Sequence, residues 1–186
     1  HGNTGVGKTD LLYKLKEKGI SIIDIEGLAN HRGSVFGDIG LKKARNQKMF
    51  DSLLWEKLEK TKKSNFIAVE AENKRIGMSN LPEFFVEKMK KGIHILIESS
   101  TERRVERIYN EYTSSYQKNK DQFIENALDS LYSIEKYLLR NNTKEKYNNL
   151  IDLLKKGNLK KVIEILLKDY YDPMYKHKQK KQKNYA

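Results

Sequence analysis

The feature that most constrains the fold of this chain is a phosphate-binding loop. Residues 2–9 are G-N-T-G-V-G-K-T, which matches the pattern G-x-x-x-x-G-K-[ST]. Glycines let the backbone curl so that several N–H groups point at one anion, while the lysine and the threonine of the motif serve the terminal phosphate and Mg²⁺. A glycine-rich turn before a helix is the competing interpretation. The motif predicts a phosphate site formed by Gly2, Asn3, Thr4, Gly5, Val6, Gly7, Lys8 and Thr9.

The residues around the motif fit this interpretation on one side only. Residues 10–16 have the apolar spacing of a helix, with Leu11, Leu12 and Leu15 on one face. The N-terminus of that helix would face a bound anion. A phosphate loop of this type normally follows a buried strand, and only His1 precedes the motif here. We therefore expect the first strand to be supplied from upstream of this sequence.

The rest of the first half alternates between strand and helix patterns. Short apolar runs predict strands at residues 20–25, 66–69 and 93–97, and amphipathic spacing predicts helices at residues 45–63 and 81–91. This alternation is typical of the α/β class, with a parallel sheet covered by helices. The expected fold is therefore a P-loop NTPase-like parallel sheet with flanking helices, followed by a C-terminal helical extension.

The strand pattern ends after Thr101. Four helical segments are expected beyond it, at residues 101–118, 121–140, 143–156 and 158–170. We accordingly divide the chain into a P-loop α/β domain (1–118), a helical subdomain (119–175) and a basic tail (176–186).

Acidic residues follow each predicted strand. Asp24 and Glu26 follow the first, Glu70 and Glu72 the second, and Glu98 the third. Ligands bind at the carboxyl ends of parallel strands, where a carboxylate can hold Mg²⁺ or accept a proton. We expect Thr9, Asp24 and Glu70 to bind Mg²⁺, with Glu70 as the strongest catalytic candidate, although acids also simply end strands.

Two basic regions are further candidates. The loop at residues 27–37 contains His31, which can exchange a proton near neutral pH, and Arg32, which can clamp a phosphate with two hydrogen bonds. An ordinary surface loop is the competing interpretation. Arg75 lies in a second basic loop and is a further candidate for an RNA contact or a lid. Arg103 and Arg107 lie one helical turn apart and are candidates for an RNA contact or for a lid over the phosphates. The competing interpretation is that they belong to a solvated helix face.

The composition limits the partners and the chemistry. The formal net charge is +12, which favours a polyanion such as RNA, although a lysine-rich solvated surface gives the same balance. The chain has no cysteine, so it contains no disulfide and no thiol nucleophile. No apolar run is long enough to span a bilayer, so we expect a cytoplasmic protein without a membrane partner. The tail lysines expected to contact RNA are Lys176, Lys178, Lys180 and Lys181.

Four segments resemble one known family. Residues 23–37, I-D-I-E-G-L-A-N-H-R-G-S-V-F-G, closely resemble the signature D-L-E-G-L-A-N-H-R-G-S-x-F-G of tRNA 2-selenouridine synthase. Residues 69–77, 102–107 and 170–175 resemble further motifs of that family: V-E-x-E-S-x-R-I-G, E-x-R-V-x-R and Y-Y-D-P-x-Y. Asn73 departs from the usual serine, and residues 44–47 depart from a common Q-P-S-Q segment.

The resemblance implies a reaction at the wobble base of certain tRNAs. There, 2-thiouridine is geranylated on sulfur from geranyl diphosphate, and selenium from selenophosphate then displaces the geranylthio group. Lys8, Thr9, Arg32 and Mg²⁺ would surround the departing diphosphate, with Lys8, Glu70, Arg32 and His31 as the catalytic set. Family members usually carry an upstream rhodanese-like domain with a catalytic cysteine. We therefore expect this chain to be the P-loop part alone, with that domain or subunit and tRNA as its partners.

Two other functions fit the same residues. A small-molecule kinase or nucleotide-hydrolysing protein would place ATP or GTP in the loop, use Glu70 to orient a hydroxyl or water, and use Arg103 and Arg107 as a lid. A non-catalytic tRNA-binding subunit would use the positive charge alone.

Overall fold

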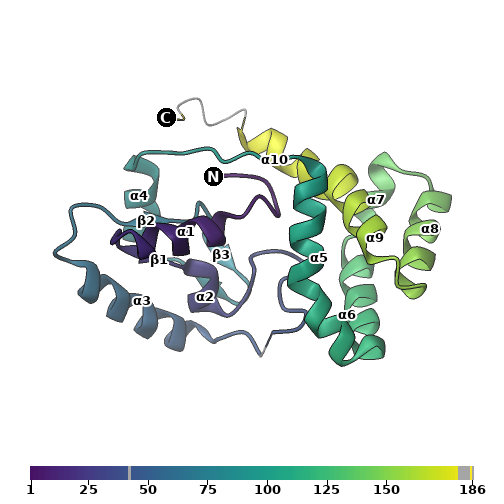
Figure 1. Ribbon diagram of the computed structural model, residues 1–186, viewed down its shortest axis with the longest axis horizontal. Coiled ribbons are helices and arrows are strands. Elements are labelled where there is room, and N and C mark those ends of the chain that lie inside the picture. Colours follow the sequence, from purple (N-terminus) through teal and green to yellow (C-terminus); the bar gives the residue numbers. More distant parts are fainter. Residues whose placement is uncertain (42, 180–184, 186) are drawn as a thin grey trace. The chain divides into compact units, whose positions relative to one another are not determined.

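The structure is a computed structural model that describes residues 1–41, 43–179 and 185. The chain forms two compact units. The N-terminal unit contains residues 1 and 7–94, and the helical unit contains residues 2–6 together with the chain from residue 95 onward. The division near residue 94 comes earlier than the expected boundary at residue 118, because the helix at residues 101–118 packs within the helical unit. Figure 1 follows the chain through both units.

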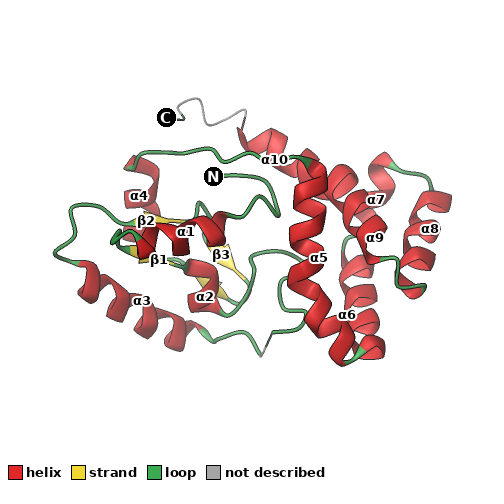
Figure 2. Cartoon of the chain, viewed as in Figure 1, coloured by secondary structure: helices red, strands yellow, loops and turns green. Residues whose placement is uncertain are grey.

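The N-terminal unit combines helices with short strands (Figure 2). Its elements, in order, are α1 (Lys8–Glu17), β1 (Ile22–Ile23), α2 (Ile25–Ala29), α3 (Gln47–Thr61), β2 (Ala68–Val69), β3 (Arg75–Ile76), β4 (Ser79–Asn80) and α4 (Glu83–Lys91). The helices predicted after the phosphate loop and at residues 45–63 and 81–91 are confirmed as α1, α3 and α4.

The strands form two small sheets. β1 and β2 are parallel, with Ile22 opposite Ala68 and Ile23 opposite Val69. This confirms the first two predicted strands and their parallel pairing, although both are shorter than expected. β3 and β4 form an antiparallel hairpin that the sequence analysis assigned to a basic loop.

The predicted strand at residues 93–97 is wrong, since these residues form no strand in the structure. The side chain of Ile93 is 85% exposed and that of Ile95 is 59% exposed. A strand inside a parallel sheet buries both faces, so its apolar residues would be covered. The observed parallel sheet is therefore the β1–β2 pair rather than the expected set of three strands.

The core of the N-terminal unit forms where α3 packs beside the strands. Phe50 and Leu54 are one helical turn apart in α3 and fully buried against Ile23, Ile76 and Leu81. The side chain of Asn46 caps α3 by accepting a hydrogen bond from the Met49 N–H at 3.0 Å. Helix α3 therefore packs in the same core as Ile23 and Val69, the residues directly before Asp24 and Glu70.

The helical unit consists of consecutive helices, which confirms the helical extension. They are α5 (Thr101–Lys118), α6 (Lys120–Ser133), α7 (Glu135–Asn141), α8 (Lys144–Lys155), α9 (Leu159–Leu166), the π-helical turn η1 (Leu167–Tyr171) and α10 (Asp172–Gln179). Ser100, Asn119 and Thr143 cap α5, α6 and α8 with side-chain oxygens. The most deeply buried core residues are Leu131, Leu150, Leu154 and Leu167.

The predicted basic tail is described only in part. Lys176 and Lys178 lie in α10, while Lys180 and Lys181 lie outside the described residues. Among the described residues, no helix is both long and apolar enough to cross a membrane.

Candidate functional site

The glycines of the phosphate loop have conformations or surroundings that exclude a side chain. Gly7 precedes α1 with φ of 93° and Gly5 has φ of 78°, both in the left-handed region that L-residues rarely adopt. A Cβ on Gly2 would lie 2.6 Å from Val6 Cγ2 and 2.8 Å from the Ile97 carbonyl oxygen. The observed backbone of this motif therefore requires glycine at residues 2, 5 and 7.

Thr9 and Glu70 are brought together in the N-terminal unit. Thr9 in α1 donates its hydroxyl hydrogen bond to Glu70 Oε1 at 2.5 Å. Glu70 directly follows β2 and is only 2% exposed, and its Oε2 atom has no hydrogen-bond partner among the described residues. Burial raises the pKa of Glu70 to about 7, against the opposing effect of the Thr9 hydrogen bond. Glu70 therefore changes charge near neutral pH.

This pair fits a magnesium ion. Mg²⁺ prefers hard oxygen ligands and keeps several of its waters, so few protein ligands suffice. The Thr9 hydroxyl and the unpaired Glu70 Oε2 supply two such oxygens. In the described part of the chain, no group of three or more His, Asp or Glu side chains is arranged to hold a metal. A magnesium site here would thus depend on the ligand's own oxygens and on water.

Glu26 and Glu72 approach each other beside Gly33. A Cβ on Gly33, whose φ is 65°, would lie 2.8 Å from Glu26 Oε1 and 2.9 Å from Glu72 Oε2. Burial, followed by the charges of Glu72 and Glu70, raises the pKa of Glu26 to about 9. Glu26 is therefore protonated at neutral pH. The charges of Asp24, Glu70 and Glu72 all act on Glu26, so four of the five acids that follow the predicted strands lie near one another, whereas Glu98 belongs to the helical unit.

Asp24 has a local structural role that the sequence analysis did not foresee. It caps α2, accepting a hydrogen bond from the Gly27 N–H at 2.7 Å through Oδ1. Its other oxygen accepts from the Tyr13 hydroxyl at 2.8 Å. Residues 25–29 are accordingly a helix rather than strand end and loop. The magnesium role of Asp24 stays a prediction, and it would use lone pairs that these two contacts leave over.

His31 lies packed between glycines. A Cβ on Gly77 would lie 2.7 Å from His31 Cγ, and one on Gly37 would lie 2.8 Å from His31 Cε1. His31 Nδ1 accepts a hydrogen bond from the Gly33 N–H at 3.0 Å, which places the proton of the neutral ring on Nε2. Burial lowers the pKa of His31, so the neutral ring is favoured. Its catalytic role stays a prediction.

The predicted arginines have distinct surroundings. Arg32 donates from Nη1 to the Ile39 carbonyl at 2.9 Å, and Arg75 donates from Nε to the Gly77 carbonyl at 3.1 Å. Both contacts hold local loops, and the phosphate and RNA roles stay predictions. Arg103 is exposed, while Arg107 donates from Nη1 to the Gly5 carbonyl at 2.9 Å. The guanidinium group of Arg107 therefore contacts the backbone of the phosphate loop.

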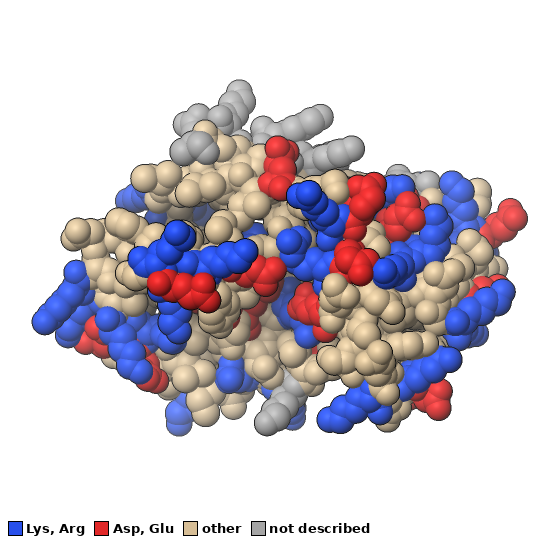
Figure 3. Space-filling model, in the orientation of Figure 1, with Lys and Arg blue, Asp and Glu red and all other residues tan. Residues whose placement is uncertain are grey.

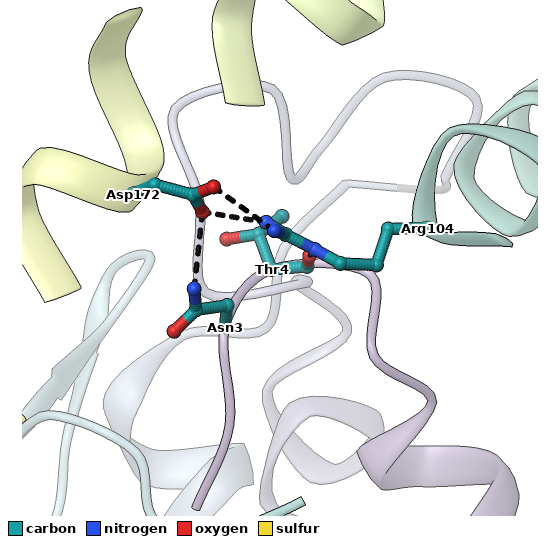
Figure 4. Close-up of polar contacts among 4 residues, drawn as sticks. All are labelled: Asn3, Thr4, Arg104 and Asp172. Atoms are coloured by element: carbon teal, nitrogen blue, oxygen red, sulfur yellow. Dashed lines mark hydrogen bonds and ion pairs between the residues drawn. The ribbon is translucent and has the colours of Figure 1, made fainter. Parts of the chain in front are cut away.

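Two residues that the site prediction missed also contact the loop (Figure 4). Arg104, which is 4% exposed, donates from Nε to the Thr4 carbonyl at 2.8 Å. Its other two nitrogens donate to Asp172 at 3.0 and 2.6 Å, and Asn3 Nδ2 donates to the same carboxylate at 3.1 Å. Two sequence features could have indicated these residues. Arg104 and Arg107 are three residues apart and so lie on one helix face, and Asp172 is the acid of the motif at residues 170–175.

These features are typical of a phosphate-binding α/β domain: a glycine loop leading into a helix, a parallel strand pair, and a buried acid on the motif threonine. The family model described as "tRNA 2-selenouridine synthase AAA domain" matches residues 1–186. The chain therefore belongs to this family.

Similar proteins agree with this assignment. The chain is 33% identical over 200 residues to a tRNA 2-selenouridine synthase of Pseudomonas syringae pv. syringae (strain B728a). The matched region covers 94% of this chain and 51% of that protein. The corresponding protein of Sulfurovum sp. (strain NBC37-1) is 31% identical over 191 residues, with the same coverage. An uncharacterised protein of Methanocaldococcus jannaschii is 31% identical over 183 residues, covering 97% of this chain and 78% of that protein.

The chain thus spans about half the length of the tRNA 2-selenouridine synthases that it matches. No solved structure is significantly similar to it.

Proposed function

We propose that this chain is the phosphate-loop part of a tRNA-modifying enzyme that converts wobble 2-thiouridine to 2-selenouridine through S-geranyl-2-thiouridine. The donors in this proposal are geranyl diphosphate and selenophosphate. The observation that carries it is the family match over the whole chain, because relatives of that family are named for this product. The phosphate-loop sequence adds a chemical reason, since both donors present phosphate oxygens.

In the first reaction, the protein must bind the diphosphate and stabilise it as it leaves. The sulfur of 2-thiouridine bonds to the geranyl carbon that carries the diphosphate as its C–O bond breaks. The diphosphate keeps the electron pair, and N3 of the base releases its proton to water. Lys8 and the N–H groups of the loop hold this anion. Thr9 and Glu70 would hold Mg²⁺, which when bound offsets the charge that develops on the leaving oxygen.

The positive charge of the chain supports a nucleic-acid partner. Lys and Arg side chains occur in several places on the face shown in Figure 3, with Asp and Glu between them. Phosphate contacts of this kind supply affinity rather than base specificity. The selenium step needs a thiol carrier in this proposal, and because the chain has no cysteine, a rhodanese-like domain or subunit supplies it.

The test is the binding of geranyl diphosphate by wild-type protein and the Lys8→Ala variant. Lys8→Ala removes a charge-assisted contact worth about 2 kcal/mol, so we expect roughly 30-fold weaker binding by calorimetry. Lys14→Ala, in the same helix, is the matched control and should bind as wild type. Equal affinities of wild type and Lys8→Ala would refute donor binding at the loop.

ATP and GTP measured beside geranyl diphosphate decide between the two enzyme classes. Tighter nucleotide binding with turnover in the absence of tRNA would favour the kinase or nucleotide-hydrolysing alternative. The buried Glu70 beside Thr9 is the feature that such an enzyme would use to orient a hydroxyl or water.

A further inference from the structure

A buried arginine and a half-buried aspartate connect the C-terminal part of the helical unit to the phosphate loop. Arg104 comes from α5 and Asp172 begins α10, yet both contact residues 3 and 4 (Figure 4). Neither residue belongs to the phosphate-binding motif. We infer that Arg104 and Asp172 are positioning residues that set the backbone conformation of the loop for anion binding, an inference that rests on the proposed function of the loop.

All three guanidinium nitrogens of Arg104 are used. Two donate to the two oxygens of Asp172, and Nε donates to the Thr4 carbonyl. A buried guanidinium needs a charged partner, and the fork geometry of arginine suits a bidentate carboxylate. The ion pair thus satisfies the buried charge and leaves one donor aimed at the loop. A lysine could pair with Asp172 but could not make all three contacts.

Asp172 contacts the loop from the other side. Its Oδ1 accepts from Asn3 Nδ2 as well as from Arg104 Nη2. Residues 3 and 4 are therefore held by one connected set of hydrogen bonds. Asp172 directly follows the π-helical turn η1, and such turns are rare and frequent at functional sites.

These contacts determine where the loop amides point. In a trans peptide the carbonyl and the next N–H point in opposite directions. The Thr4 carbonyl faces Arg104 and the Gly5 carbonyl faces Arg107, so the N–H groups of Gly5 and Val6 point away from these two guanidinium groups. The Val6 N–H donates to the Asn3 carbonyl at 3.3 Å. Gly5 packs so closely on α5 that its Cβ would lie 2.7 Å from Ile108 Cδ1. The arginines thereby orient the amides with which such a loop binds anions.

The first test uses amide exchange in the absence of any ligand. In the double variant Arg104→Met with Asp172→Leu, apolar side chains replace this largely buried ion pair, an exchange that commonly preserves stability. We expect its melting temperature to stay close to that of wild type, while the Gly5 and Val6 amides exchange about tenfold faster by NMR. Glu106→Gln, which removes the exposed Lys160–Glu106 pair on the same helix, should leave exchange unchanged.

The second test measures binding of inorganic diphosphate and geranyl diphosphate with Mg²⁺. Arg104→Lys keeps a charge paired with Asp172 but loses the Thr4 contact, so we expect about tenfold weaker binding at unchanged melting temperature. Asn3→Ala provides a milder version that removes no buried charge, with about threefold weaker binding.

The outcomes separate this inference from the proposed function. A folded Arg104→Lys or double variant with wild-type amide exchange would overturn the inference, whatever the protein binds. Wild-type protein that binds neither diphosphate would overturn the proposed function, and the exchange measurement would still decide whether Arg104 and Asp172 hold the loop.

Discussion

Glu26 is a carboxyl group that keeps its proton at neutral pH and therefore carries no negative charge there. Its pKa is raised to about 9, first by burial and then by Glu72 and Glu70. A protonated Glu26 can donate a hydrogen bond to a nearby carboxylate, as the approach of Glu26 and Glu72 at Gly33 permits. The negative charge beside Thr9 is therefore smaller than the sequence suggests.

Glu26 should make the stability of the protein fall as pH rises. The folded-state pKa lies above the unfolded value of about 4.5, so the folded state binds this proton more tightly. The resulting stabilisation is fully present below pH 4.5 and is lost as pH rises through 9. Glu26→Gln keeps the shape without titrating. Between pH 5 and pH 9 we therefore expect wild type to lose about 5 kcal/mol more stability than Glu26→Gln does.

Urea unfolding in magnesium-free buffer at both pH values measures this effect. Exposed Glu17→Gln in α1 is the control and should follow wild type. If wild type and Glu26→Gln lost the same stability between pH 5 and pH 9, the raised pKa of Glu26 would be contradicted.

Part of the candidate site was predictable at the scale of single residues. Thr9 and Glu70 could be paired because a motif threonine and an acid after a parallel strand meet at one sheet edge, and they do hydrogen-bond. The role of Asp24 was not predictable, since an acid after a strand and an acid that caps a helix occur in the same local sequence. Whether Arg32 turns to a ligand or to the Ile39 carbonyl depends on loop geometry that has no periodic signal.

At the scale of elements, pattern length determined what the sequence predicted. The helix at residues 101–118 was predicted with its observed bounds, because its helical pattern is long, and the structure adds that Ser100 caps it. The β3–β4 hairpin was missed, since its strands have two residues each and no alternation can be recognised. Residues 93–97 have the apolar composition of a buried strand, but that composition cannot show whether neighbouring strands cover them.

The hairpin turn gives a prediction with a matched control. Gly77 and Gly19 both have left-handed backbones, with φ of 56° and 82°. A Cβ on Gly77 would meet the His31 ring, whereas one on Gly19 meets nothing within 4 Å. We expect Gly19→Ala to cost about 1 kcal/mol of stability and Gly77→Ala about 2–3 kcal/mol. Chemical denaturation measures both losses. Equal losses would show that the His31 ring can move away from the new Cβ without loss of stability.

At the scale of the whole molecule, the division into two units was predictable in kind but not in position. The change from alternating patterns to continuous helices indicated a second, helical part. The assignment of residues 2–6 to that part was not predictable, because it depends on contacts between residues far apart in sequence, such as Asn3 with Asp172. Local periodicity has no information on such pairs.

The net charge of +12 leads to a prediction about RNA. Each neutralised phosphate contributes roughly 0.7–0.9 to the slope of log affinity against log salt. Changing Lys176, Lys178, Lys180 and Lys181 to Gln should lower that slope for tRNA by about two to four. The control changes four exposed lysines at the end of α3 and just beyond it: Lys57, Lys60, Lys62 and Lys63. Titrations at several salt concentrations that give equal slopes for both variants would remove any special role for the tail.

The contacts of the phosphate loop also have a consequence for how the protein is made. Residues 3 and 4 leave the ribosome well before their partners, because Arg104 lies 100 residues after Thr4 and Asp172 lies 169 residues after Asn3. Since a chain is synthesised at roughly 5–20 residues per second, the start of the loop waits for many seconds without its partners. This segment therefore reaches its final conformation long after it is made, and a nascent chain that stalls before Asp172 emerges cannot complete this set of hydrogen bonds.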